Sequence, residues 1–232
     1  MWDHRDVLRI ASDGLAAKAR SIEAEQSAYG LESLAEVAFH PILAHAFSAR
    51  GLGVRREWPY PGVPEKRPKF AARNRCDIVL TQGPGLHLLD PVAELLETDK
   101  AQGTLFEASP TRHPNRPTTA VPAEDAYWLE VKVVGQYTYT QGVPGPNRAY
   151  GSELTQSLTI DLAKIAADPA LRSSGLLLIL FTDSQETADH DVLVALHRAL
   201  DKGLSFSAPS TERFPVPDRI GNTMCSVVLV PR

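Results

Sequence analysis

The stretch Tyr127–Val134, read as YWLEVKVV, decides the fold of this chain. Aromatic and β-branched residues dominate it, which predicts a strand, and side chains two apart on a strand share a face. The face that carries charge consists of Trp128, Glu130, Lys132 and Val134. A carboxylate and an ammonium group thus lie side by side on a strand apolar enough to be central. Burying either charge alone costs several kcal/mol, so the pair requires a partner, a metal ion or a cleft beside it.

The composition is that of an ordinary globular protein. With 232 residues, 43% of them hydrophobic and 22% charged, the chain is long enough for one well-packed domain and short for two. We expect a single domain over residues 1–232, with a helical extension over 1–30 and an insertion over 83–125. The N-terminus is charged from its third residue, and the longest purely apolar run, Leu176–Phe181, is too short to cross a bilayer. A cytoplasmic protein without a membrane partner is therefore expected.

Cysteine and histidine show no metal-ligand spacing. Cys76 and Cys225 lie in apolar runs and form no C-x-x-C motif, which favours buried thiols over a disulfide. His40 and His45 share a predicted helix but are five residues apart, whereas zinc-binding helices place two histidines four apart. A structural zinc site is therefore not expected.

The charge of the chain is unevenly distributed. The formal net charge is −4, which argues against general electrostatic attraction to nucleic acid. The tract from Arg50 to Arg75 nevertheless holds eight basic and two acidic residues, so it carries +6 and the remainder −10. Two interpretations stay open: this tract contacts phosphates in one groove, or it is a solvated loop.

The other segments predict an α/β fold. Apolar patterns with helical period predict helices over residues 3–28, 31–50, 152–167 and 185–202. Extended apolar runs predict further strands over 54–60, 75–81, 175–182 and 223–230. The insertion is rich in Pro and Gly, with a helix expected over 91–101 and an irregular loop over 109–122. A mixed central sheet covered by helices on both faces is the natural packing for this order.

Three acidic residues stand where apolar residues are expected. Aspartate is poorly suited to a strand interior, yet Asp77 lies within the strand RCDIVLT. We expect it on the face opposite Cys76, Ile78 and Leu80. Glu36 lies in a helix that is apolar almost all round, one turn before His40, and Asp161 falls within the apolar stripe of its helix. Each is expected to meet a buried donor or a functional site.

Taken together, these residues resemble the core of the PD-(D/E)XK nuclease superfamily, which has the restriction-endonuclease-like fold. The shared pattern is Glu36 on a helix, Asp77 on a strand, Glu130-x-Lys132 on the next strand, and then a helix. It covers roughly residues 31–182 with the insertion left out. The superfamily's proline before the aspartate is Cys76 here. The interval of 53 residues from Asp77 to Glu130 requires the insertion to loop away from the sheet.

The chemistry of phosphodiester hydrolysis explains why these residue types are needed. One or two Mg²⁺ or Mn²⁺ ions can activate a water and neutralise the charge that develops on the phosphate. Carboxylates on adjacent strands suit such hard ions, so Asp77 and Glu130 are the expected ligands. Lys132, about 6.6 Å along the strand, can orient the water or stabilise negative charge. The resemblance further implies the carbonyl of Val131 as a ligand, and Glu36 as a ligand of a second ion or its water shell.

DNA is the partner that the resemblance implies. Candidate contacts are Arg55, Arg56, Arg73, Arg75, Arg148 and Gln156. Arg148 and Tyr150 border the turn-rich loop Gly142–Asn147, and Gln156 and Lys164 lie on the helix that follows. Solvated surface is the favoured interpretation for these four residues and the alternative for the arginines of the basic tract. A homodimer is also considered, because enzymes that cut both strands pair two copies. The first helix packs either across the domain or against such a copy.

Alternatives stay open for every site residue. Glu130 and Lys132 can form a cross-strand ion pair, Asp77 can cap a turn, and Glu36 can face solvent. The alternative function is a catalytically inactive nucleic-acid-binding or protein-interaction module on the same fold; a hydrolase of nucleotides or small phosphoesters is more remote. Serine hydrolase and dinucleotide-binding activities lack support, because the sequence has no G-x-S-x-G, P-loop or G-x-G-x-x-G motif.

Overall fold

The computed structural model describes residues 2–62, 74–93 and 119–232. Within them, six strands form one mixed sheet in the order β1-β2-β5-β8-β10-β9. The strands are β1 (Gly53–Pro59), β2 (Arg75–Thr81), β5 (Tyr127–Gly135), β8 (Ser173–Thr182), β9 (Ser210–Pro215) and β10 (Met224–Pro231). Within this six-stranded sheet β5 and β8 pair in parallel, and every other pair of neighbouring strands is antiparallel. The predicted mixed sheet is confirmed, with β5 inside it.

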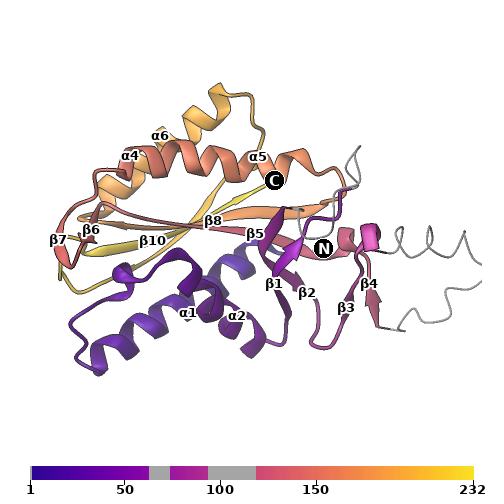
Figure 1. The fold of residues 1–232 in the computed structure, drawn as a ribbon, viewed down its shortest axis with the longest axis horizontal. Helices are drawn as coiled ribbons and strands as arrows, with labels where there is room; N and C mark the ends of the chain where they lie inside the picture. The colour runs from indigo at the N-terminus through magenta and orange to yellow at the C-terminus, as the bar shows by residue number, and fades with distance from the viewer. Residues whose placement is uncertain (1, 63–73, 94–118) are drawn as a thin grey trace, which may run out of the picture.

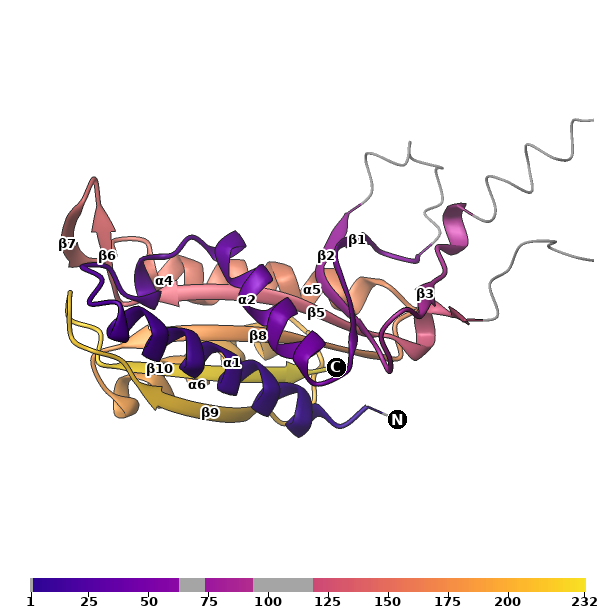
Figure 2. The same ribbon diagram turned by 90° about the horizontal axis from the view of Figure 1, so that it is seen from below.

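Helices cover the sheet on both faces (Figure 1). On one side lie α1 (His4–Ala24) and α2 (Glu36–Ala49). The short 3₁₀ turn η1 (Leu31–Ser33) lies between them in the chain. On the other lie α4 (Tyr150–Ser152), the π-turn η4 (Glu153–Ser157), α5 (Leu158–Ala167) and α6 (Gln185–Asp201). Figure 2 shows α1 and α2 lying across the sheet, with β9 at one edge of it and β1 at the other.

Two apolar cores result, one on each side of the sheet. Trp128 and Val134 belong to the core under α5 and α6, whereas Leu129 and Val131 belong to the core under α1 and α2. The alternation predicted for YWLEVKVV is thereby confirmed. The first helix buries Val7, Leu8, Ala11, Leu15 and Ile22 in this second core, so it packs across its own domain. Cys76 and Cys225 are buried free thiols, as predicted.

The predicted helix over 31–50 is wrong at its start. The chain first makes the turn η1, and α2 begins at Glu36, so Glu36 lies in the first helical turn with its side chain 39% exposed. A carboxylate in this position interacts favourably with the partial positive charge of the helix N-terminus. The C-terminal half of the prediction holds, because Phe39, Leu43 and Phe47 fill the core under the sheet.

The pairing of β1 with β2 is interrupted where Glu57 faces Asp77. Residue pairs on either side of this point are in register, Arg56 with Ile78 and Trp58 with Cys76. Glu57 itself has a φ of 53°, a left-handed conformation that costs a non-glycine residue on the order of 1 kcal/mol or more. Cys76 consequently belongs to the core under α5, while Ile78 belongs to the core under α2. The prediction that Cys76 and Ile78 share a face is wrong for this reason.

Several elements were not predicted. A two-residue turn at Gln141 and Gly142, both with positive φ, joins β6 (Tyr137–Thr140) to β7 (Val143–Pro146). Positive φ at both positions is typical of a type I′ hairpin turn. The insertion contributes a parallel pair, β3 (His87–Leu88) with β4 (Ala120–Val121), and the 3₁₀ turn η3 (Ala123–Asp125). Residues 91–93 of the predicted 91–101 helix are helical, and the rest lies outside the described residues, as does most of the 109–122 loop.

The apolar stripe predicted for the 185–202 helix, which consists of Val192, Leu193, Leu196 and Leu200, is partly wrong. Leu193 and Leu200 are about half exposed or more, at 58% and 49%. The residues of α6 that are buried against the sheet are Ala188, Ala195, Leu196 and Ala199. None of the helices within the described ranges is both long and apolar enough to span a bilayer.

Candidate functional site

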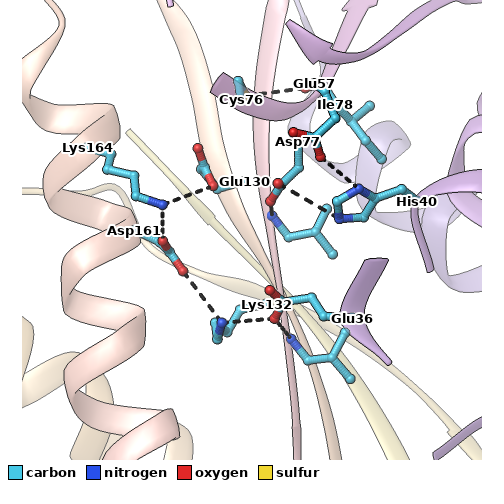
Figure 3. A network of polar contacts seen from close by, with 12 residues as sticks. Glu36, His40, Glu57, Cys76, Asp77, Ile78, Glu130, Lys132, Asp161 and Lys164 are labelled. Carbon is cyan, nitrogen blue, oxygen red and sulfur yellow. Dashed lines mark hydrogen bonds and ion pairs between the residues drawn. The ribbon is translucent and has the colours of Figure 1, made fainter. Parts of the chain in front are cut away.

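The central strand has an open edge, and two carboxylates occupy it. β5 pairs with β2 only over Tyr127–Leu129, although it continues to Gly135 along β8. Beyond Leu129, the backbone N–H of Val131 donates to Asp77 Oδ2 at 2.8 Å, and the N–H of Val133 donates to Glu36 Oε2 at 3.0 Å. Side chains from β2 and α2 therefore replace the missing strand neighbour. Figure 3 shows both carboxylates converging on this edge.

Glu130 is a buried acid beside a second acid. Its residue is 2% exposed, and Oε1 accepts a 2.5 Å hydrogen bond from the hydroxyl of Tyr60. Burial raises the pKa of Glu130 to about 8, and the negative charge of Asp77 adds to the rise. The pKa of Asp77 is also raised by burial, although its hydrogen bond from Val131 offsets part of the effect. The two carboxyl groups therefore compete for ionisation at neutral pH.

Two ammonium groups flank this pair of acids. Lys132 Nζ lies 2.9 Å from Glu36 Oε2 and 3.9 Å from Asp161 Oδ2. Lys164 Nζ lies 2.7 Å from Asp161 Oδ1 and 3.8 Å from Glu130 Oε2. Burial is the largest single influence on Lys164 and lowers its pKa, but the hydrogen bond to Asp161 and the negative charges of Glu130, Asp161 and Asp77 together outweigh burial and raise the pKa. Both lysine side chains point toward the carboxylates (Figure 3).

A third group of polar residues adjoins Asp77 on its other side. His40, from α2, is 3% exposed, with Nδ1 3.5 Å from Glu57 Oε1 and Nε2 3.9 Å from Asp77 Oδ1. One ligand atom from each of His40, Glu57 and Asp77 lies within 4.8 Å of the others. The register of β1 with β2 places Glu57 opposite Asp77.

The four residues of the predicted centre are thus brought together. Asp77, Glu130, Lys132 and Glu36 all border the open edge of β5. Asp161 contacts Lys132, in agreement with the expectation that it meets a site. Lys164 was taken for solvated helix surface, and that prediction is wrong. The sequence contained a signal for it, because residues three apart on a helix are neighbours and Asp161 was already suspected.

The sequence pattern does not indicate that His40, Glu57 or Tyr60 belongs to the site. His40 was considered only as a partner for His45, and Glu57 only as a charge within the basic tract. No local pattern predicts their approach to Asp77 and Glu130, because it depends on the interrupted pairing of β1 with β2.

The candidate nucleic-acid contacts are scattered. Arg55 and Arg56 are exposed and line a shallow groove of about 500 Å³ between α2 and β1, whose other lining residues are Ala44, His45, Ser48, Val54 and Trp58. Arg75 donates to the carbonyl of Glu57 at 2.8 Å. Arg148 and Gln156 are exposed on the side of α4 and η4, and the hydroxyl of Tyr150 donates to Asp191. Arg73 lies outside the described residues.

Comparison with known proteins gives no match: no family model, no curated protein and no solved structure is similar to this chain. The chemistry of the site therefore rests on its own residues.

Proposed function

We propose that this protein is a divalent-metal-dependent nuclease with a restriction-endonuclease-like core. The observation that carries the proposal is the placement of Asp77 and Glu130 beside each other at the open edge of β5, with Lys132 and Glu36 adjoining. Such a placement is unfavourable for a structural ion pair, because Glu130 is buried next to a like charge and its pKa is about 8.

The donor set fits Mg²⁺ or Mn²⁺. Glu36, Asp77, Glu130 and Asp161 supply four carboxylates, and Lys132 and Lys164 supply two ammonium groups, which leaves a charge of −2 when all are ionised. In a strand, the N–H and the C=O of one residue point toward the same edge, so the carbonyl of Val131 points toward Asp77 as its N–H does. Hard oxygen donors of this kind are the ligands that Mg²⁺ prefers.

The Mg²⁺ or Mn²⁺ ion would be held by Asp77, Glu130 and the carbonyl of Val131. Glu36 would bind a second ion or its water shell. A bound divalent cation would polarise the phosphate and lower the pKa of a water. Lys132 and Lys164 would stabilise negative charge that develops on the phosphate, because both ammonium groups already face the carboxylates. Arg55 and Arg56, in the groove beside β1, would contact the DNA backbone, and Trp58 offers a ring for base stacking.

The test is cleavage of supercoiled plasmid and of single-stranded DNA in Mg²⁺ or Mn²⁺. We expect the wild type to cut at least one of them, and both Asp77→Asn and Glu130→Gln to abolish cutting. Glu212→Gln is the matched control, since Glu212 is an exposed carboxylate on β9 at the far edge of the sheet. Cleavage that survives Glu130→Gln unchanged would rule the proposal out. Hydrolysis of free nucleotides but not of DNA would favour the small-phosphoester alternative.

A second candidate is a non-catalytic binding module on the same scaffold. It is favoured by one observation: the protein itself supplies hydrogen-bond or ion-pair partners to Glu36, Asp77 and Glu130. Calorimetry in the absence of DNA distinguishes the two, because this candidate predicts no heat of Mg²⁺ or Mn²⁺ binding that depends on Glu130.

A further inference from the structure

We propose that His40, Glu57 and Asp77 form a site for a first-row transition-metal ion such as Co²⁺ or Zn²⁺. This inference goes beyond the proposed nuclease centre: it adds an imidazole ligand and a residue of β1, and it shares only Asp77. Metal binding is measured without nucleic acid, so it does not require the chain to be a nuclease.

The first argument is the state of His40. Its residue is 97% buried, and neither ring nitrogen has a hydrogen-bond partner among the residues that the structure describes. A buried imidazole without a partner is unfavourable, because its nitrogens have lost their hydrogen bonds to water and gained none in the protein. Each nitrogen instead faces a carboxylate oxygen, Glu57 Oε1 for Nδ1 and Asp77 Oδ1 for Nε2.

The distances from the His40 nitrogens to the two carboxylates are too long for hydrogen bonds. A protonated imidazole bonded to a carboxylate places nitrogen and oxygen about 2.7 to 2.9 Å apart. The observed separations are 3.5 Å and 3.9 Å, which are too long for such hydrogen bonds. Two ligand atoms at about 2.1 Å from one metal ion lie about 3.0 to 3.5 Å apart at octahedral to tetrahedral angles. An imidazole binds one ion through a single nitrogen, and one ligand atom from each of His40, Glu57 and Asp77 lies within 4.8 Å of the others. The 3.5 Å separation between His40 Nδ1 and Glu57 Oε1 has the magnitude expected for two ligands, and the half-exposed side chain of Glu57 can move to adjust the other distances.

The strand pairing also places Glu57 for this role. The register of β1 with β2 sets Glu57 across from Asp77, where the ladder is interrupted and Glu57 has a left-handed backbone that is unfavourable for glutamate. The nitrogen ligand then sets the preference among cations: imidazole suits metals such as Co²⁺ and Zn²⁺, whereas Mg²⁺ prefers oxygen ligands alone. We therefore expect selection of a transition metal over Mg²⁺ at this position.

The probe is Co²⁺ alone, titrated into the full chain and followed by visible absorption and calorimetry. We expect one Co²⁺ per chain, bound in the presence of excess Mg²⁺, and at least tenfold weaker binding in Glu57→Gln, whose exposed side chain makes unfolding no concern. His40→Gln should weaken binding similarly, and His45→Gln, an exposed histidine of the same helix, should not.

Glu130→Gln separates this site from the proposed nuclease centre. If the transition-metal site is correct, Glu130→Gln retains Co²⁺ binding even where it abolishes Mg²⁺-dependent cleavage. Failure of DNA cleavage in the wild type with intact Co²⁺ binding would remove the nuclease function and leave this site. The inference would be overturned if Glu57→Gln and His40→Gln both bound Co²⁺ as tightly as the wild type does. It would also be overturned if the wild type gave no Co²⁺ absorption band.

Discussion

Replacing Glu130 by glutamine should stabilise the protein at alkaline pH while it removes activity. The carboxyl group of Glu130 is held against Asp77 in a buried place, and this raises its pKa from 4.5 to about 8. The folded protein then binds a proton that the unfolded chain releases between these two values. Wild-type stability therefore falls as the pH rises through this interval, and the loss is complete above pH 8.

The magnitude follows from the two pKa values. Each tenfold change in proton affinity is worth about 1.4 kcal/mol. The ionised Glu130 therefore lowers the free energy of unfolding by up to roughly 5 kcal/mol, or by about 2 kcal/mol if the protein around the carboxylate relaxes. For a chain of this size, 1 kcal/mol corresponds to roughly 2 to 4 °C in Tm. We therefore expect Tm of Glu130→Gln to exceed that of the wild type by about 4 to 20 °C at pH 8.5. The glutamine carbonyl can still accept the hydrogen bond of Tyr60.

The assay is thermal unfolding at pH 5 and at pH 8.5 in EDTA. The groups that face Glu130 are Asp77 of β2, Tyr60, and Lys164 and Asp161 of α5, and the variant leaves all of them in place. The difference in Tm between variant and wild type should be small at pH 5 and large at pH 8.5. The control Glu212→Gln should show no such dependence on pH. A variant that is less stable than the wild type at pH 8.5 would refute the reasoning, because Glu130 would then be a stabilising partner of Lys164.

Three further predictions concern neighbouring residues. Asp77→Ala should lower the free energy of unfolding by about 1 to 3 kcal/mol more than Asp77→Asn in denaturant titrations, because only alanine leaves the N–H of Val131 without its acceptor; equal losses would contradict this account of the open edge. Lys132→Met should reduce the cleavage rate at least about 100-fold while calorimetric Mg²⁺ affinity stays the same or rises; unchanged cleavage would exclude Lys132 from the chemistry. Asn222→Ala should lower the free energy of unfolding by about 2 to 3 kcal/mol, since buried Asn222 bonds both the N–H and the C=O of the hairpin residue Tyr137; a loss below about 0.5 kcal/mol would contradict that role.

The strands of the core were predictable because their sequences admit few alternatives. RCDIVLT and GLLLILFT are short apolar runs between turn residues, and both form strands at the expected positions. The strand β9 was missed because an edge strand buries little: Ser210–Pro215 pairs only with β10 and contains charged residues. The hairpin of β6 and β7 was read as a loop, since two positive-φ positions in sequence are needed to form it and only Gly142 signals one of them.

The site was predictable as far as it follows from the strand pattern. Glu130 and Lys132 share a face by alternation, and Asp77 was suspected because aspartate is unusual inside a strand. Lys164, Tyr60 and His40 reach the same place through contacts between elements, Lys164 with Glu130, Tyr60 with Glu130, and His40 with Asp77. Such contacts depend on how helices and loops pack. Among these three residues only Lys164 has a signal in the sequence, because it lies three residues after Asp161.

The central claim is that Asp77 and Glu130 bind one divalent cation together at the open edge of β5. The most direct measurement is a crystal structure after a soak in Mn²⁺, with anomalous scattering to locate the ion. We predict an anomalous peak with oxygen atoms of both Asp77 and Glu130 at about 2.0 to 2.3 Å. Absence of any ion that has both Asp77 and Glu130 as ligands would contradict the account, whereas an additional ion at His40, Glu57 and Asp77 would not.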